Sequence, residues 1–192
     1  MRASARAVED FESRSRALGE RLRDQDFLHN RGLGNEVGIF TFCYDPALEM
    51  RARDLFRRLE ADETLPCRIV EKNLYDVMLG CLREKRVLDR LADFEGKHGR
   101  EGVERQIRRI CTPEVFARAC AYEPREEGDV LLITGVGEVY PFMRLHTLLE
   151  NLQPLVSDVP IITAYPGRFD GKTLSLFGRL PAENYYRAFD LV

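Results

Sequence analysis

The segment DVLLITGVGEVYPFMRLHTLLENLQPLVSDVPIITAYPG, residues 129–167, decides the fold. Its first apolar run, Val130–Thr134, breaks at Gly135 and Gly137, and a helical pattern of apolar residues follows. A second apolar run, Val159–Ala164, ends at a Tyr-Pro-Gly turn. A strand, a glycine turn, a helix and a second strand form one βαβ unit, whose two strands lie parallel in one sheet. The rest of the chain is therefore expected to supply further strands and the helices that cover them.

The upstream part of the chain also alternates strand and helix patterns. Residues 37–43 form an almost continuous apolar run, as in a strand buried on both faces, and a helical pattern follows Asp45 and Pro46. A short strand is predicted over Cys67–Glu71. We predict one α/β domain over residues 1–192, with a mostly parallel sheet of about four to five strands flanked by helices and a helical insertion at 74–122. An amphipathic helix within residues 1–24 is expected either to cover this domain or to bind a partner.

The composition indicates a folded protein without a strongly basic surface. Hydrophobic residues make up 44% of the chain, enough for a core, and the formal net charge of −3 argues against general nucleic-acid binding. The five cysteines lack CxxC spacing, so we expect structural thiols rather than disulfides or a zinc site, and no cofactor. The N-terminal residues lack an apolar core of signal-peptide length, and no window suits a membrane helix. We expect a cytoplasmic protein without a membrane association.

Two loops that follow predicted strands carry candidate ligand-binding residues, since open α/β sheets often bind ligands at the carboxyl ends of their strands. Asp45 could bind a cation or act as an acid or base, but its position also suits the N-cap of a helix. Gly135 and Gly137 could present amides to a phosphate or nucleotide, although Glu138 places an anion there and no Walker A lysine follows. A tight turn that needs a positive φ is the simpler interpretation.

The helix predicted after this turn carries Arg144 and His146 as further candidates. His146 and Glu150 are i,i+4 neighbours, so they can form a charge-assisted pair. Catalytic use of a histidine needs a nucleophile or a metal beside it, and no local motif supplies one. A metal-dependent nuclease of the common strand-end type would need an acid two residues before a lysine, whereas Glu71 is adjacent to Lys72.

Two C-terminal segments complete the set of candidates. Residues 165–171, YPGRFDG, are expected to form a loop in which Arg168 and Asp170 contact a substrate, a protein partner or solvent. Residues 184–189, NYYRAF, are expected to form a short terminal helix that docks on the domain or marks an interface. Its candidate residues are Tyr185, Tyr186 and Arg187.

Several of these segments together resemble one known family, BrxB. The specific match lies in residues 129–192, in TGVGEVYPFMRLHTLLENLQ (134–153), AYPGRFDGKTLSLFGRL (164–180) and NYYRAFDLV (184–192). FCYDPALEMRARDL, residues 42–55, is similar to a segment nearer the N-terminus of that family. Residues 82–127 carry little recognisable pattern.

The resemblance implies a small cytoplasmic component of a BREX anti-phage assembly, in a family without an established enzymatic activity. The expected partners are the alkaline-phosphatase-like protein PglZ in the first place, then the ATPase BrxC and the methyltransferase PglX. We therefore hypothesise a non-catalytic adaptor that binds PglZ. One alternative is a nucleotide- or phosphate-binding or hydrolytic enzyme that uses the loops after the strands. The other is DNA binding by the helical insertion, against which its interleaved acids argue.

Overall fold

The computed structural model describes residues 3–31, 38–170, 172–180, 183–184 and 189–191. In this part of the chain, parallel strands form a sheet in the order β2-β3-β4-β1-β7. The strands are β1 (Ile39–Tyr44), β2 (Arg68–Asn73), β3 (Asp129–Thr134), β4 (Ile161–Phe169) and β7 (Phe189–Asp190). β5 (Thr173–Leu176) pairs antiparallel with the end of β4, and β6 (Glu183–Asn184) pairs with β5. The prediction of an α/β fold with a mostly parallel sheet is confirmed.

The βαβ unit that the sequence predicts is present at the centre of the sheet. β3 and β4 are parallel neighbours, in a register that places Leu131 opposite Ile161. β1 lies on the other side of β4, with Ile39 opposite Ile161. Because side chains alternate along a strand, β1 directs Phe40 and Phe42 to one face of the sheet and Ile39 to the other. Over its described residues 39–43, the apolar run is thus explained by burial on both faces.

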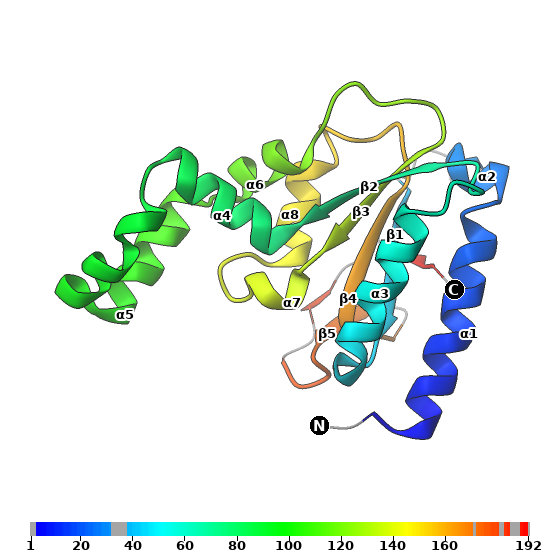
Figure 1. The fold of residues 1–192 in the computed structure, drawn as a ribbon, viewed down its shortest axis with the longest axis horizontal. Coiled ribbons are helices and arrows are strands. Elements are labelled where there is room, and N and C mark those ends of the chain that lie inside the picture. Colours follow the sequence, from blue (N-terminus) through cyan, green and yellow to red (C-terminus); the bar gives the residue numbers. More distant parts are fainter. Residues whose placement is uncertain (1–2, 32–37, 171, 181–182, 185–188, 192) are drawn as a thin grey trace.

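Helices cover both faces of the sheet (Figure 1). One layer consists of α1 (Ala5–Arg21), α2 (Gln25–Leu28) and α3 (Glu49–Glu60), which the short 3-10 helix η1 (Pro46–Leu48) precedes. The opposite layer contains α4 (Leu74–Glu84), α6 (Pro113–Cys120), α7 (Val136–Val139) and α8 (Leu145–Leu152). The 3-10 helix η2 (Leu88–Arg90) and α5 (Leu91–Ile110) extend from this second layer. The helical segment expected at 74–122 therefore lies between two hydrogen-bonded strands, β2 and β3.

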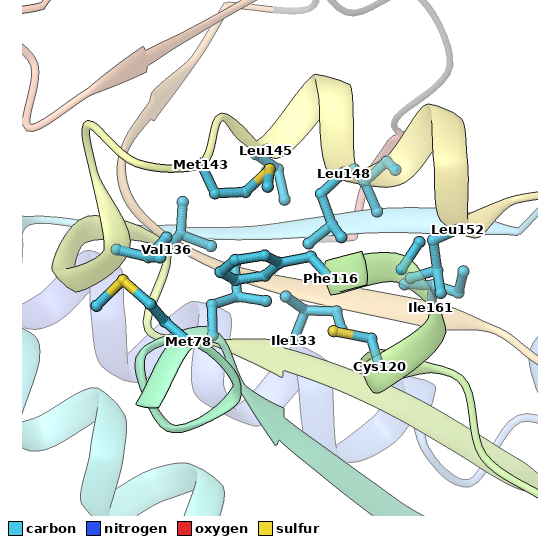
Figure 2. Packing of buried hydrophobic residues seen from close by; sticks show 14 of the residues in the cluster. Met78, Phe116, Cys120, Ile133, Val136, Met143, Leu145, Leu148, Leu152 and Ile161 are labelled. Atoms are coloured by element: carbon cyan, nitrogen blue, oxygen red, sulfur yellow. The ribbon is translucent and has the colours of Figure 1, made fainter. Parts of the chain in front are cut away.

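The core beneath the second layer is packed from large apolar side chains (Figure 2). Phe116 of α6 points into its middle, between Ile133 of the sheet and Leu148 of α8. All three side chains are fully buried. Thr112 caps α6 by accepting a hydrogen bond from the amide of Val115 at 3.4 Å. This layer holds the helical segment firmly on the sheet at α4 and α6.

α1 covers the other face, in agreement with the first of its two interpretations. Ser4 accepts a hydrogen bond from the amide of Ala7 at 3.1 Å and caps the helix. Phe11 and Leu18 are buried against the sheet, and the ring of Phe11 meets that of Phe42 edge-on at 6.0 Å. The apolar stripe of α1 is therefore used inside the protein.

A buried carboxylate joins the amino ends of β2 and β3. Asp129 is 1% exposed and accepts hydrogen bonds from Nε of Arg68 at 2.9 Å and from its Nη2 at 2.6 Å. The hydroxyl of Tyr122 and the amide of Glu126 also donate to Asp129, at 3.1 and 3.0 Å. Burial by itself would raise the pKa of Asp129, but the hydrogen bonds from Arg68, Glu126 and Tyr122 hold that pKa below its usual range.

The structure corrects three expectations about the C-terminal third. The helix expected after the glycine turn is broken into α7 and α8, since Pro141 lies between them and lacks the amide that a continuous helix needs. Residues 165–169, expected in a loop, continue β4, where they pair with β1 and then with β5. The terminal helix is wrong at its ends, because Asn184 belongs to β6 and Phe189 to β7. Tyr185, Tyr186 and Arg187 lie outside the described residues.

Candidate functional site

Two clefts open near the carboxyl ends of the strands, on the side where α/β sheets often bind ligands. The larger, about 1100 Å³, lies between α1, the ends of β1 and β4, and the turn after β5; we call it the arginine cleft. The smaller, about 300 Å³, lies between α3 and the ends of β2 and β3; we call it the glutamate cleft. The charged residues that line the arginine cleft are Arg6, Asp10, Arg14, Asp45, Arg168, Arg179 and Asp190. Those that line the glutamate cleft are Glu49, Arg53, Arg57, Glu60 and Glu71.

Asp45 acts as a helix cap at the rim of the arginine cleft. It follows the last residue of β1, and its carboxylate accepts a hydrogen bond from the amide of Ala47 at 2.8 Å. Pro46 occupies the first position of η1, where its missing amide costs nothing. The capping interpretation is confirmed. The Asp45 carboxylate is consequently held by the chain's own backbone.

The glycine turn after β3 has a structural role, because its conformation and packing require glycine. Gly135 has a φ of 73°, which side-chain-bearing residues rarely adopt. A Cβ at this position would lie 2.7 Å from Oδ1 of Asn73, the oxygen that caps α4 by accepting from the amides of Tyr75 and Asp76. Gly137 faces the ring of Phe177. Since α7 is only four residues long, the turn lacks the extended helix whose amino end would bind a phosphate.

Glu138 is engaged in an ionic network beside the glutamate cleft. Its carboxylate lies 2.6 Å from Nη2 of Arg53. Nε of Arg53 donates to Glu49 at 2.9 Å, and the hydroxyl of Tyr44 donates to the other oxygen of Glu49 at 2.8 Å. The hydrogen bonds with Glu138 and Glu49 raise the pKa of Arg53, so its charge is secure. The network ties the start of α3 to α7.

A second polar contact lies in the lining of the glutamate cleft. The hydroxyl of Thr134, at the end of β3, donates to the carboxylate of Glu71 in β2. Because side chains alternate along β2, Lys72 points to the opposite face of the sheet from Glu71. An acid and a lysine therefore do not meet here as a strand-end nuclease site would require, in agreement with their unfavourable spacing in the sequence.

The remaining candidates are spread over other parts of the surface. Arg144 precedes α8 and is exposed, and His146 lies half-buried in that helix; neither lines the two clefts. Asp170 forms the turn between β4 and β5 by accepting from the amides of Lys172 at 2.9 Å and Thr173 at 2.7 Å. The hydroxyl of Thr173 also donates to it, and these hydrogen bonds hold the pKa of Asp170 below its usual range. Asp170 is thus a structural residue of the turn.

Arg168 lies at the exposed end of β4 and lines the arginine cleft together with three arginines that no sequence motif indicates, Arg6, Arg14 and Arg179. Arg14 of α1 pairs with Asp190 of β7 at 2.5 Å. Asp45 and Arg168 were both expected at strand ends, and the structure brings them to one cleft. Arg6 and Arg14 had no local signal, because they reach the cleft from a helix that precedes the first strand.

The cysteines show no sign of reactivity. All five are free; Cys67 is partly buried and the others are buried. Burial raises the pKa values of Cys43, Cys111 and Cys120 to about 12, which disfavours the reactive thiolate. Within the described ranges, no group of three or more metal-ligating side chains could hold a metal ion. Nor is any helix there long and apolar enough to cross a membrane.

The fold is that of a small α/β protein. Most of the acids near the carboxyl ends of its strands form ion pairs or hydrogen bonds with the chain's own arginines, hydroxyls and amides. Residues 70–191 match the family model described as BREX protein BrxB. The chain is 38% identical over 179 residues to a BREX protein BrxB of Bacillus cereus strain H3081.97, which covers 90% of this chain and 92% of the relative. It is 31% identical over 187 residues to that of Escherichia coli O9:H4 strain HS, with 95% and 92% covered.

The chain therefore belongs to the BrxB family and is a component of a BREX phage-defence system. This membership confirms the resemblance seen in the sequence. No solved structure gave a significant match. Membership in the family indicates other BREX proteins as the partners, without saying which of them the chain contacts.

Proposed function

We propose that the chain is a non-catalytic adaptor within the BREX assembly and that it binds the alkaline-phosphatase-like protein PglZ. The first support is the state of the candidate catalytic acids. Asp45 caps a helix, Glu138 pairs with Arg53, and Asp170 holds a turn. An acid or base that acts on a substrate has to be able to reach the reacting atoms, and these three carboxylates are engaged elsewhere.

The observation that carries the proposal is the helical arm, residues 83–110, which extends away from the sheet at the left of Figure 1. Within α5 the helix breaks at Gly99, where φ is 67° and ψ is 177°. The described side chains of α5 are mostly exposed, and its buried residues are Gly102 and Ile107. A segment that buries so little apolar surface contributes little to the folding free energy, yet its ordering has an entropic cost. Contact with another protein is a function that would explain it.

The charge of the arm sets it apart from the rest of the chain. Residues 83–110 contain nine Lys and Arg and six Asp and Glu, whereas the whole chain has a net charge of −3. Glu104 pairs with Arg108 at 3.0 Å, but Lys97 and Arg100, which flank the break at Gly99, have no ion pair within the described ranges. Exposed cations of this kind steer a partner with an acidic surface toward the arm.

Binding of purified PglZ from the same BREX system, measured by isothermal titration calorimetry, tests the proposal. We expect a sub-micromolar Kd, which corresponds to more than about 8 kcal/mol of binding free energy. Lys97→Glu with Arg100→Glu should weaken binding about tenfold or more, since like charges at an interface repel. Arg16→Glu with Arg118→Glu changes the total charge equally on exposed helix surfaces away from the arm and should have little effect.

Absence of heat at tens of micromolar of both proteins would rule out PglZ as the direct partner. If binding is tight but the arm variant behaves like its control, the adaptor function stands and the arm is not the docking element.

DNA binding is the second candidate, favoured by the net positive charge of the arm. It predicts that the affinity for a fluorescent duplex falls steeply with salt, with a log–log slope of about −0.9 for each phosphate neutralised. The arm variant Lys97→Glu with Arg100→Glu would then lower DNA affinity and reduce this slope. Absence of duplex binding at low salt would exclude this function.

A further inference from the structure

We infer that the arginine cleft binds an extended acidic segment of a second protein, so that the chain holds two partners at once. The inference rests on the proposed adaptor function, since an adaptor needs a second binding surface besides the arm. Figure 1 shows α5 and α1 at opposite ends of the longest axis of the molecule, and the cleft lies along α1. Two proteins bound at these places would be held apart.

The balance of charges in the cleft favours an anionic ligand. Of its three acids, Asp190 pairs with Arg14, Asp45 accepts a hydrogen bond from the amide of Ala47, and Asp10 is exposed, against four arginines in the lining. Arg6 and Arg168 are exposed and have no ion pair in the described part of the chain. Each guanidinium can bind a carboxylate through two parallel hydrogen bonds, a geometry that lysine does not provide. The cleft therefore carries unused cationic donors in a chain that is acidic as a whole.

An aromatic residue in a strained conformation forms part of the same cleft. Phe177 has a φ of 57°, which non-glycine residues seldom adopt, and the residue is 37% exposed. Its amide donates to the carbonyl of Pro166 at 2.8 Å, which fixes the turn after β5 against the end of β4. Backbone strain of this kind tends to occur at functional sites. Here it holds an exposed ring beside the arginines.

The size and lining of the cleft select a polypeptide over other anions. A volume of about 1100 Å³ far exceeds what a single phosphate fills, and Phe169 and Leu180 add apolar surface to that of Phe177. Because Asp10 and Asp45 alternate with arginines in the lining, the cleft suits a ligand with widely spaced negative charges better than a nucleic-acid strand, which carries one at every phosphate. A peptide in which acidic residues alternate with apolar ones can place carboxylates at the arginines and apolar side chains at the rings.

Fluorescence polarisation of a short fluorescein-labelled peptide, with glutamate alternating with leucine and tyrosine, tests the inference on the full chain. We expect saturable binding that inorganic phosphate does not displace and that exceeds binding of an equally charged polyglutamate peptide. Arg6→Glu with Arg168→Glu should weaken binding about tenfold or more. Arg16→Glu with Arg118→Glu, an equal change of charge at exposed positions outside the cleft, should leave it unchanged. Circular dichroism and thermal melting check that both variants fold.

Phe177→Gly tests the contribution of the aromatic ring to peptide binding independently of the arginine charges. Glycine accepts the positive φ, so the fold should be retained while the peptide binds several-fold more weakly. Tighter binding of a single-stranded oligonucleotide than of the peptide would overturn the inference in favour of a nucleic acid. Equal peptide binding by the Arg6→Glu, Arg168→Glu variant and its control would overturn it as well. Neither result affects the titration with PglZ, so the two proposals can fail separately.

Discussion

Replacing Gly135 by alanine tests whether the glycine turn after β3 is a structural element. Two costs follow from the structure. A Cβ forces a side-chain-bearing residue to keep a φ of 73°, at roughly 1–2 kcal/mol. The same Cβ would lie 2.7 Å from Oδ1 of Asn73, so Asn73 has to move away from the amides of Tyr75 and Asp76 that it caps. Loss of an N-cap costs roughly 0.5–2 kcal/mol. We expect a total destabilisation of about 2–3 kcal/mol.

Urea denaturation followed by circular dichroism measures this change, and two other glycines supply controls. Gly178 also has a positive φ, of 61°, but no atom lies within 4 Å of a Cβ placed there, so Gly178→Ala should lose about 1 kcal/mol of unfolding free energy. Gly96 lies in α5 with open space around it, and Gly96→Ala should gain up to about 1 kcal/mol from helix propensity.

A double-mutant cycle with Asn73→Ala isolates the contact itself. If Gly135→Ala displaces the cap, that part of its cost disappears when Asn73 is also replaced. The double variant should then be destabilised by less than the sum of the two single-variant destabilisations. Full additivity, or a Gly135→Ala variant no less stable than Gly178→Ala, would refute the assignment of a packing role to Gly135.

Three further predictions follow from buried groups. Asp129→Asn should lower the unfolding free energy by about 2 kcal/mol, because Arg68 and Tyr122 lose the charged acceptor of their hydrogen bonds. Arg68 holds the folded-state pKa of Asp129 below the unfolded value of about 3.9. The stabilisation is therefore present above that pH and is lost as the pH falls through the folded-state pKa. Acid titration of the unfolding free energy of the wild type and of Asp129→Asn measures this loss. Cys43, whose pKa burial raises to about 12, should react with a thiol reagent at pH 8 only after unfolding. Rapid labelling of Cys43 itself in the folded protein, located by peptide mass spectrometry and distinguished from the partly buried Cys67, would contradict this burial. Phe116→Ala should cost about 3–5 kcal/mol in urea denaturation, and a loss below about 1 kcal/mol would show that the core under α6 repacks.

Much of the fold could be predicted because the deciding signals are local. The runs at Val130–Thr134 and Val159–Ala164 show their burial in their own composition, and Asp45 with Pro46 marks a helix start by position alone. The predictions are wrong where contacts with residues far away in the sequence determine the local structure. Tyr-Pro-Gly at 165–167 suggests a turn, yet it remains in β4 because β1 pairs with it, and the absence of a side chain at Gly167 lets β5 approach closely.

The candidate sites likewise depend partly on local sequence signals and partly on contacts between distant residues. The i,i+4 spacing of Glu49 and Arg53 is visible in the sequence, but the contact of Arg53 with Glu138 depends on how α3 crosses the sheet. Likewise, the pairing of Arg14 with Asp190 joins the first helix to the last described strand. No local pattern contains such contacts, so both clefts emerge only when the chain is folded.

The strand order has a consequence for the protein as it is being synthesised. β1 pairs with β4 and β7, and β2 pairs with β3, so the two strands made first are not each other's partners. Until residues 161–169 have left the ribosome, the strand with Phe40 and Phe42 has no neighbour to bond with. Pairings between segments so far apart form slowly, and unpaired apolar strands are prone to aggregate in the meantime. A nascent chain of this protein is therefore expected to need chaperone protection until residues 161–169 emerge.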